Sequence, residues 1–65
     1  MKVKRVIEIL EANGWQIVRH KASSHRQYRK AGNDKVVTVP GHPREDMPTG
    51  TLARLRRTTQ IEELR

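Results

Sequence analysis

The stretch WQIVRHKASSHRQYRKAGNDKVVTV, residues 15–39, decides the fold because it holds three β-prone runs separated by two short turns. The runs cover residues 15–20, 25–30 and 35–39, and the last is rich in β-branched valine and threonine. KASS and AGND between them are rich in residues that favour tight turns. Strands joined so closely pair in antiparallel fashion, so this stretch predicts a three-stranded antiparallel sheet.

An amphipathic helix is predicted immediately before the sheet, in VKRVIEILEANG. Apolar side chains recur there at intervals of three and four residues: Val3, Val6, Ile7 and Leu10. Gly14 is expected to end the helix, because glycine readily adopts the left-handed conformation that closes one.

A second, shorter helix is predicted in TLARLRR, residues 51–57. A loop over residues 40–50 precedes it, containing three prolines and two glycines. Leu52 and Leu55 would face the core, while arginines would face solvent.

The C-terminal tail contains a candidate capping box. Thr59 would be the N-cap of a last helical turn, and Glu62 stands three residues later. Such a turn would bury Ile61 and Leu64.

The element order is therefore helix, three strands, helix, within a single domain spanning residues 1–65. Both helices must bury their apolar sides on one face of the sheet, which predicts an α+β two-layer sandwich. The other face of the sheet is then exposed to solvent.

The charge is strongly positive, with 14 Lys and Arg, 7 Asp and Glu, and a net charge of +7. Between Arg19 and Lys35 there are six basic residues and one acidic residue, Asp34. This distribution favours a polyanionic partner such as nucleic acid, although a simple solvated surface explains it equally well.

Several classes of protein fit the sequence poorly. There is no cysteine, and no apolar run approaches the roughly 20 residues that span a bilayer. The three histidines, His20, His25 and His42, lack both cysteine partners and the HExxH spacing of zinc sites. We therefore expect a soluble cytoplasmic protein with neither a metal site nor a cofactor.

His25 is the candidate catalytic residue. RNA cleavage without a metal needs a base for the 2′-hydroxyl proton, an acid for the leaving oxygen and cations for the phosphorane charge. His25 supplies the base, and the serines Ser23 and Ser24 could bind a phosphate. The cations beside it are Arg26, Arg29 and Lys30, with Lys21 upstream. The competing interpretation is that His25 is an exposed strand residue without a chemical role.

Strand alternation divides these residues between two faces. His25, Gln27 and Arg29 would share one face, and Arg26, Tyr28 and Lys30 the other. Tyr28 fits a packing ring better than a platform for stacking RNA bases.

The remaining candidates have simpler interpretations. His20 is interpreted as a surface residue of the first strand, and His42 as a loop residue. The arginines of the last helix are interpreted as its solvated side, with phosphate or partner contact as the alternative: Arg54, Arg56 and Arg57.

Four segments in this order carry a family resemblance: NGW, SSHRQYRK, VVTVPGH and MPTGTLARL. The most specific residues are Ser24, His25 and Tyr28 in the second segment, and those of the pattern P-x-GT-L: Pro48, Gly50, Thr51 and Leu52. The chain resembles the HicA-type toxins of bacterial toxin–antitoxin systems over nearly its full length.

The resemblance implies a double-stranded-RNA-binding-domain-like αβββα fold and an mRNA interferase, an endoribonuclease that arrests translation. The essential histidine of the family's Gly-Ser-His motif corresponds to His25, and a HicB-type antitoxin is the implied partner. This chain departs from the family in having Ser23 where glycine is usual. The RNA-binding set expected around His25 lies within residues 21–30: Lys21, Ser23, Ser24, Arg26, Tyr28, Arg29 and Lys30. The alternative function is a non-catalytic RNA-binding module of the same fold.

Overall fold

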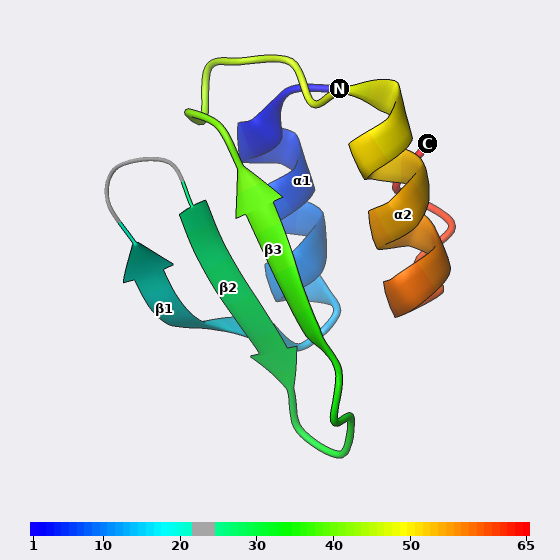
Figure 1. Ribbon diagram of the computed structural model, residues 1–65. Helices are drawn as coiled ribbons and strands as arrows, with labels where there is room; N and C mark the ends of the chain where they lie inside the picture. Colours follow the sequence, from blue (N-terminus) through cyan, green and yellow to red (C-terminus); the bar gives the residue numbers. More distant parts are fainter. Residues whose placement is uncertain (22–24) are drawn as a thin grey trace.

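A computed structural model describes residues 1–21 and 25–65, with only the backbone of Lys21 described. The elements follow the order helix, three strands, helix (Figure 1): α1 (Val3–Ala12), β1 (Trp15–Lys21), β2 (His25–Lys30), β3 (Val36–Pro40) and α2 (Thr49–Thr59). The strand order is β1-β2-β3, and both pairs are antiparallel. The α+β, αβββα fold expected from the sequence is confirmed.

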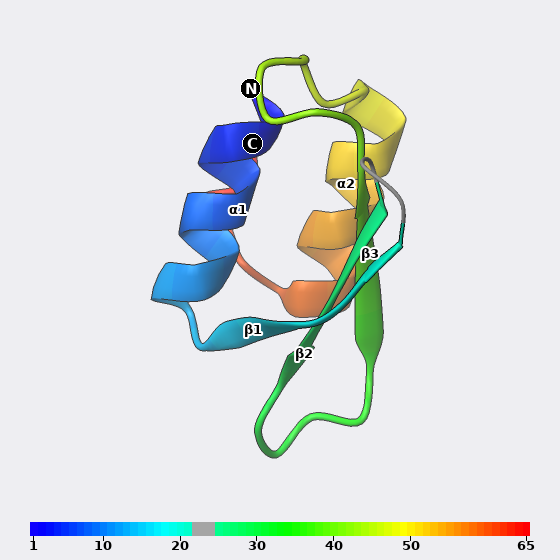
Figure 2. The ribbon, with the colours of Figure 1, turned by 90° about the vertical axis from the view of Figure 1, so that its left-hand side faces the viewer.

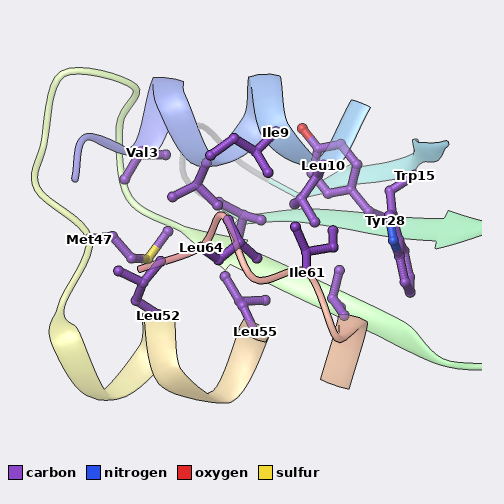
Figure 3. Packing of buried hydrophobic residues seen from close by; sticks show 13 residues of the cluster. Val3, Ile9, Leu10, Trp15, Tyr28, Met47, Leu52, Leu55, Ile61 and Leu64 are labelled. Atoms are coloured by element: carbon purple, nitrogen blue, oxygen red, sulfur yellow. The ribbon is translucent and has the colours of Figure 1, made fainter. Parts of the chain in front are cut away.

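The two helices cover one side of the sheet, and α2 lies beside the edge strand β3 (Figures 1 and 2). Between the layers lies a hydrophobic core in which Trp15 and Tyr28 are each only 1% exposed (Figure 3). The described outer side of β3 carries exposed Val36 and Thr38, whereas Val37 faces the core. One face of the sheet is therefore left to solvent, as predicted.

The core-facing side of α1 differs from the prediction by one position. Val3, Val6, Ile9 and Leu10 are buried, whereas Ile7 is only partly buried at the edge of the core. The error is physical in origin, because Ile7 and Ile9 flank the apolar stripe on opposite sides. Only the position of the sheet decides which flank is covered.

Gly14 ends α1 as predicted. Its φ of 90° is left-handed, and its N–H donates a hydrogen bond to the carbonyl oxygen of Glu11 at 3.1 Å. The chain therefore reverses in one residue, and Trp15 enters the core directly.

Three strand ends differ from the sequence prediction, including the start of β3, which is Val36 and not Lys35. β1 extends to Lys21, and its pairing with β2 shifts register between Ile17 and Arg19. β3 includes Pro40, which pairs with His25, instead of ending before it. Proline is tolerated at this point because β3 is an edge strand and the residue is its last.

The predicted capping box in the tail is wrong. Thr59 is the last residue of α2, and its hydroxyl donates to the carbonyl oxygen of Leu55 at 2.7 Å. Gln60 then adopts a left-handed conformation with φ of 59°, which ends the helix. The Thr59 oxygen also accepts a hydrogen bond from the N–H of Ile61 at 3.3 Å, as an N-cap would. However, the Glu62 carboxylate binds Arg65 and does not close the box.

The burial predicted for the tail is nevertheless confirmed. Ile61 and Leu64 are 6% and 0% exposed (Figure 3). Arg56 Nη1 donates to the carbonyl oxygen of Leu64 at 2.9 Å. The tail therefore closes the core beneath both helices.

The loop between β3 and α2 is fastened to the start of α1. None of the described side chains caps α1, but the N–H of Val3 donates to the carbonyl oxygen of Glu45 at 2.8 Å, and the N–H of Lys4 donates to the carbonyl oxygen of Pro43 at 3.0 Å. These bonds satisfy amide groups that a helix start leaves unpaired. The loop is thereby held in position, and with it the beginning of α2.

Candidate functional site

His25 begins β2 and lies between both neighbouring strands. It pairs with Lys21 of β1 and with Pro40 of β3, and it is exposed. Its face of β2, which also carries Arg29, is opposite to the face on which Tyr28 is buried. The imidazole therefore belongs to the solvent side of the sheet.

The cations predicted beside His25 are divided between the two faces. Arg29 is exposed on the face of His25, whereas Arg26 and Lys30 alternate onto the face of Tyr28. Arg26 Nη1 donates to the carbonyl oxygen of Gly41 at 3.2 Å, so this guanidinium braces the loop after β3. The structure brings only Arg29 of these three to the side of His25.

Tyr28 has to be removed from the predicted RNA-contacting set. Its side chain is 1% exposed and forms part of the core, so an RNA base cannot stack on the ring. Burial raises the pKa of the phenol, and the negative charge of Glu11 raises it further. The positive charge of Arg26 lowers this pKa but does not cancel the rise. The packing role is confirmed.

Other predicted residues are placed as follows. Ser23 and Ser24, and the side chain of Lys21, lie outside the described residues. His20 is exposed on β1, in agreement with its interpretation as a surface residue. His42 is exposed in the loop after β3, where its N–H donates to Glu45 Oε1 at 2.6 Å.

A groove runs between β3 and α2, and His25 forms part of its wall. Its volume is about 400 Å³. The lining residues come from three elements: His25 of β2; Val36, Val37, Thr38 and Pro40 of β3; Thr51, Arg54, Leu55 and Thr58 of α2. The α2 members are spaced by three, four and seven residues from Thr51, so they form one side of the helix.

Sequence reasoning missed the α2 wall of this groove. The sequence could not show that Thr51, Arg54 and Thr58 line one groove, because the opposite wall, formed by β3, is distant in the sequence. The available signal was their helical spacing in line with the buried Leu55. The structure also separates Arg54 from the other two arginines of α2, since Arg56 and Arg57 line a different hollow and Arg56 binds the tail.

The groove therefore combines three kinds of chemical group. An imidazole can accept or donate a proton, a guanidinium can bind a phosphate through two parallel hydrogen bonds, and threonine hydroxyls can both donate and accept. Across the described residues, no three His, Cys, Asp or Glu side chains are grouped as a metal site. Neither described helix is long and apolar enough to cross a membrane.

Comparison with known proteins identifies the family. A family model described as the HicA toxin of bacterial toxin-antitoxin systems matches residues 3–61. The chain belongs to the HicA toxin family. A solved structure of a HicA3 and HicB3 toxin-antitoxin complex is similar to this HicA chain, with 34% sequence identity and a TM-score of 0.78. The similarity covers 94% of this chain and 96% of that one. A search of curated proteins gave no match.

Membership confirms the resemblance noted in the sequence. This HicA protein is a toxin of a toxin–antitoxin system. The match includes all five helices and strands, so the groove is built entirely from elements of the family fold.

Proposed function

We propose that this HicA protein is a metal-independent endoribonuclease that cleaves mRNA in the cytoplasm and arrests translation, with His25 as its catalytic residue. The observation that carries the proposal is that exposed His25 lines one groove together with Arg54 and threonine hydroxyls. Family membership supports it, because it makes the chain a toxin.

The reaction uses the nucleophile that RNA itself provides. His25 takes the proton of a 2′-hydroxyl, and the 2′-oxygen forms a bond to the adjacent phosphorus. The bond from phosphorus to the 5′-oxygen breaks, and that oxygen receives a proton. The products are a 2′,3′-cyclic phosphate and a 5′-hydroxyl, so protons and charge balance without water or metal in this step.

His25 can serve both proton transfers in turn. After accepting the 2′-hydroxyl proton, the imidazolium is an acid able to protonate the leaving 5′-oxygen. Arg29 lies on the same face of the sheet and attracts the RNA backbone to it. Ser23 and Ser24, together with Lys21, complete the proposed RNA contacts next to His25.

The proposed partner is a HicB-type antitoxin that inhibits by covering His25. The similar solved structure is a complex of HicA3 with HicB3, at 34% identity over 94% of this chain. A protein seated over the solvent face of β2 would exclude RNA from the groove.

Induced expression in a bacterial host tests the function. We would compare wild type with His25→Ala and, as a matched control, with His20→Ala, which removes an exposed histidine from the neighbouring strand. Wild type and His20→Ala should arrest growth and degrade RNA on a gel, whereas His25→Ala should do neither.

Three results would contradict the proposal. Arrest by His25→Ala with RNA decay would remove His25 from the chemistry. Growth arrest by wild type and by His25→Ala, with RNA intact in each, would favour the non-catalytic RNA-binding module. If soluble wild type is inactive, Ser23→Gly restores the family motif, and continued inactivity would then reject the endoribonuclease.

A further inference from the structure

We propose that the groove between β3 and α2 binds a single strand of RNA, and that Arg54 holds one of its phosphates. This assignment rests on the proposed function and extends it, because it names where the substrate lies and which conformation of RNA is accepted.

The groove follows β3 along its length and reaches His25 at one end. Pro40, paired with His25, lies at one end of β3, and Val36 lies at the other. Strands rise by about 3.3 Å per residue, so these two positions are about 13 Å apart. This length accommodates a short segment of a nucleotide strand next to His25. Figure 1 shows α2 beside β3, and residues of both elements line the groove.

The lining of the groove matches the chemistry of a nucleotide strand. Val36 is 48% exposed, so its side chain does not serve the core and is available to contact a base or ribose. The hydroxyls of Thr38, Thr51 and Thr58 can bond to phosphate oxygens and to ribose hydroxyls. The groove therefore offers apolar surface, threonine hydroxyls and the guanidinium of Arg54 to a bound strand.

Arg54 is suited to bind an anion in this groove. It is exposed and forms no hydrogen bond or ion pair with any side chain in the described part of the chain. None of the nine described residues that line the groove is acidic. A phosphate would thus be the natural partner of this guanidinium.

The same surface is poorly suited to duplex RNA. Domains of this fold contact a duplex across about 16 base pairs, through shape and phosphate contacts spread over a broad surface. The first turn of α2, Thr49 to Leu52, carries no basic residue, and the basic residues of its last turn are Arg56 and Arg57. Arg56 is engaged with Leu64, and of the α2 arginines only Arg54 lines the groove that contains His25.

A matched pair of arginine variants tests the assignment. Arg54→Gln and Arg57→Gln remove the same charge from exposed positions three residues apart on α2, but only Arg54 lines this groove. The probe is a fluorescent single-stranded 2′-fluoro RNA of randomised sequence, which lacks the nucleophilic hydroxyl and stays intact. Binding to the full chain is measured by anisotropy over a range of salt concentrations.

The assignment predicts a difference between the two variants. Arg54→Gln should weaken binding about tenfold and lower the salt dependence, log K against log salt, by about 0.7. Arg57→Gln should stay within about twofold of wild type, and both should melt like wild type because the side chains are exposed. A self-complementary 2′-fluoro duplex should bind more weakly than the single strand.

Equal effects of the two variants would overturn the assignment, as would tighter binding of the duplex. Unchanged RNA binding by Arg54→Gln with weakened binding of a HicB-type antitoxin would assign the groove to the antitoxin instead. These outcomes are separate from catalysis because the probe cannot be cleaved. A chain that bound RNA through Arg54 but cut no natural RNA would refute the proposed function alone.

Discussion

Arg26 Nη1 donates a hydrogen bond to the carbonyl oxygen of Gly41, 3.2 Å away. Gly41 is the first residue after β3, has a left-handed φ of 89°, and follows Pro40, the partner of His25 in the sheet. Arg26, the residue after His25, therefore holds the backbone that follows Pro40, the partner of His25 in β3. Arg26 thus positions the end of the sheet from which His25, the proposed catalytic residue, projects.

Replacing this arginine should destabilise the protein. Arg26→Ala removes a partly buried hydrogen bond from a charged donor and should lower the free energy of unfolding by about 1 kcal/mol. Arg29→Ala, at an exposed position of the same strand, should change it by less than about 0.5 kcal/mol. Urea unfolding measures both, and equal losses would show that the bond does not brace the fold.

Tyr28 predicts a loss of stability in alkaline solution. Burial raises the pKa of its phenol above the unfolded value of about 10, so the folded state favours the neutral form. This contribution is fully present below the unfolded pKa and is lost as the pH rises through the higher folded pKa. Tyr28→Phe should lack this step in urea unfolding measured against pH.

The single tyrosine of the chain allows a direct titration. Tyrosinate absorbance reports Tyr28 alone, since no other tyrosine is present. Its midpoint in the folded protein should exceed the midpoint in urea. Coincident midpoints would contradict the burial of this phenol.

The C-terminal tail should contribute substantially to stability. Leu64 is 0% exposed, and Leu64→Ala should lower the free energy of unfolding by about 3 kcal/mol through lost burial and a residual cavity. Glu63→Ala, at the neighbouring exposed position, is the control. If the two variants unfolded at the same urea concentration, the tail would not be part of the cooperative core.

Antitoxin binding should depend on salt. The proposed interface includes the basic face around His25, so an acidic HicB-type partner would be steered to it, and added salt would slow association. Arg29→Gln should slow it further at low salt, whereas Arg5→Gln on α1 should not. Stopped-flow mixing measures the rates, and a rate independent of salt would argue against this interface.

The sequence was sufficient for features that depend on neighbouring residues. Helical spacing identified α1, β-branched runs and short turns identified the sheet, and Gly14 marked the reversal into Trp15. Period-two alternation also placed Arg26 and Tyr28 away from His25, and the structure agrees. Including Tyr28 in an RNA-contacting set ignored that alternation.

Features that depend on packing between distant elements could not be predicted. Whether Ile7 or Ile9 faces the core depends on where the sheet lies relative to α1. Arg54 belongs to the groove of His25 only because α2 packs beside β3. The spacing within α2 specifies a side of the helix but not the element against which that side lies.

Cleavage of RNA by the purified chain in EDTA, comparing wild type with His25→Ala, tests the central claim most directly. Wild type should produce fragments ending in a 2′,3′-cyclic phosphate, and His25→Ala should cleave at least about 100-fold more slowly. A DNA strand of the same sequence, which lacks the 2′-hydroxyl nucleophile, should remain intact. Undiminished cleavage by His25→Ala, or cleavage abolished by EDTA and restored by Mg²⁺ or Zn²⁺, would contradict the account.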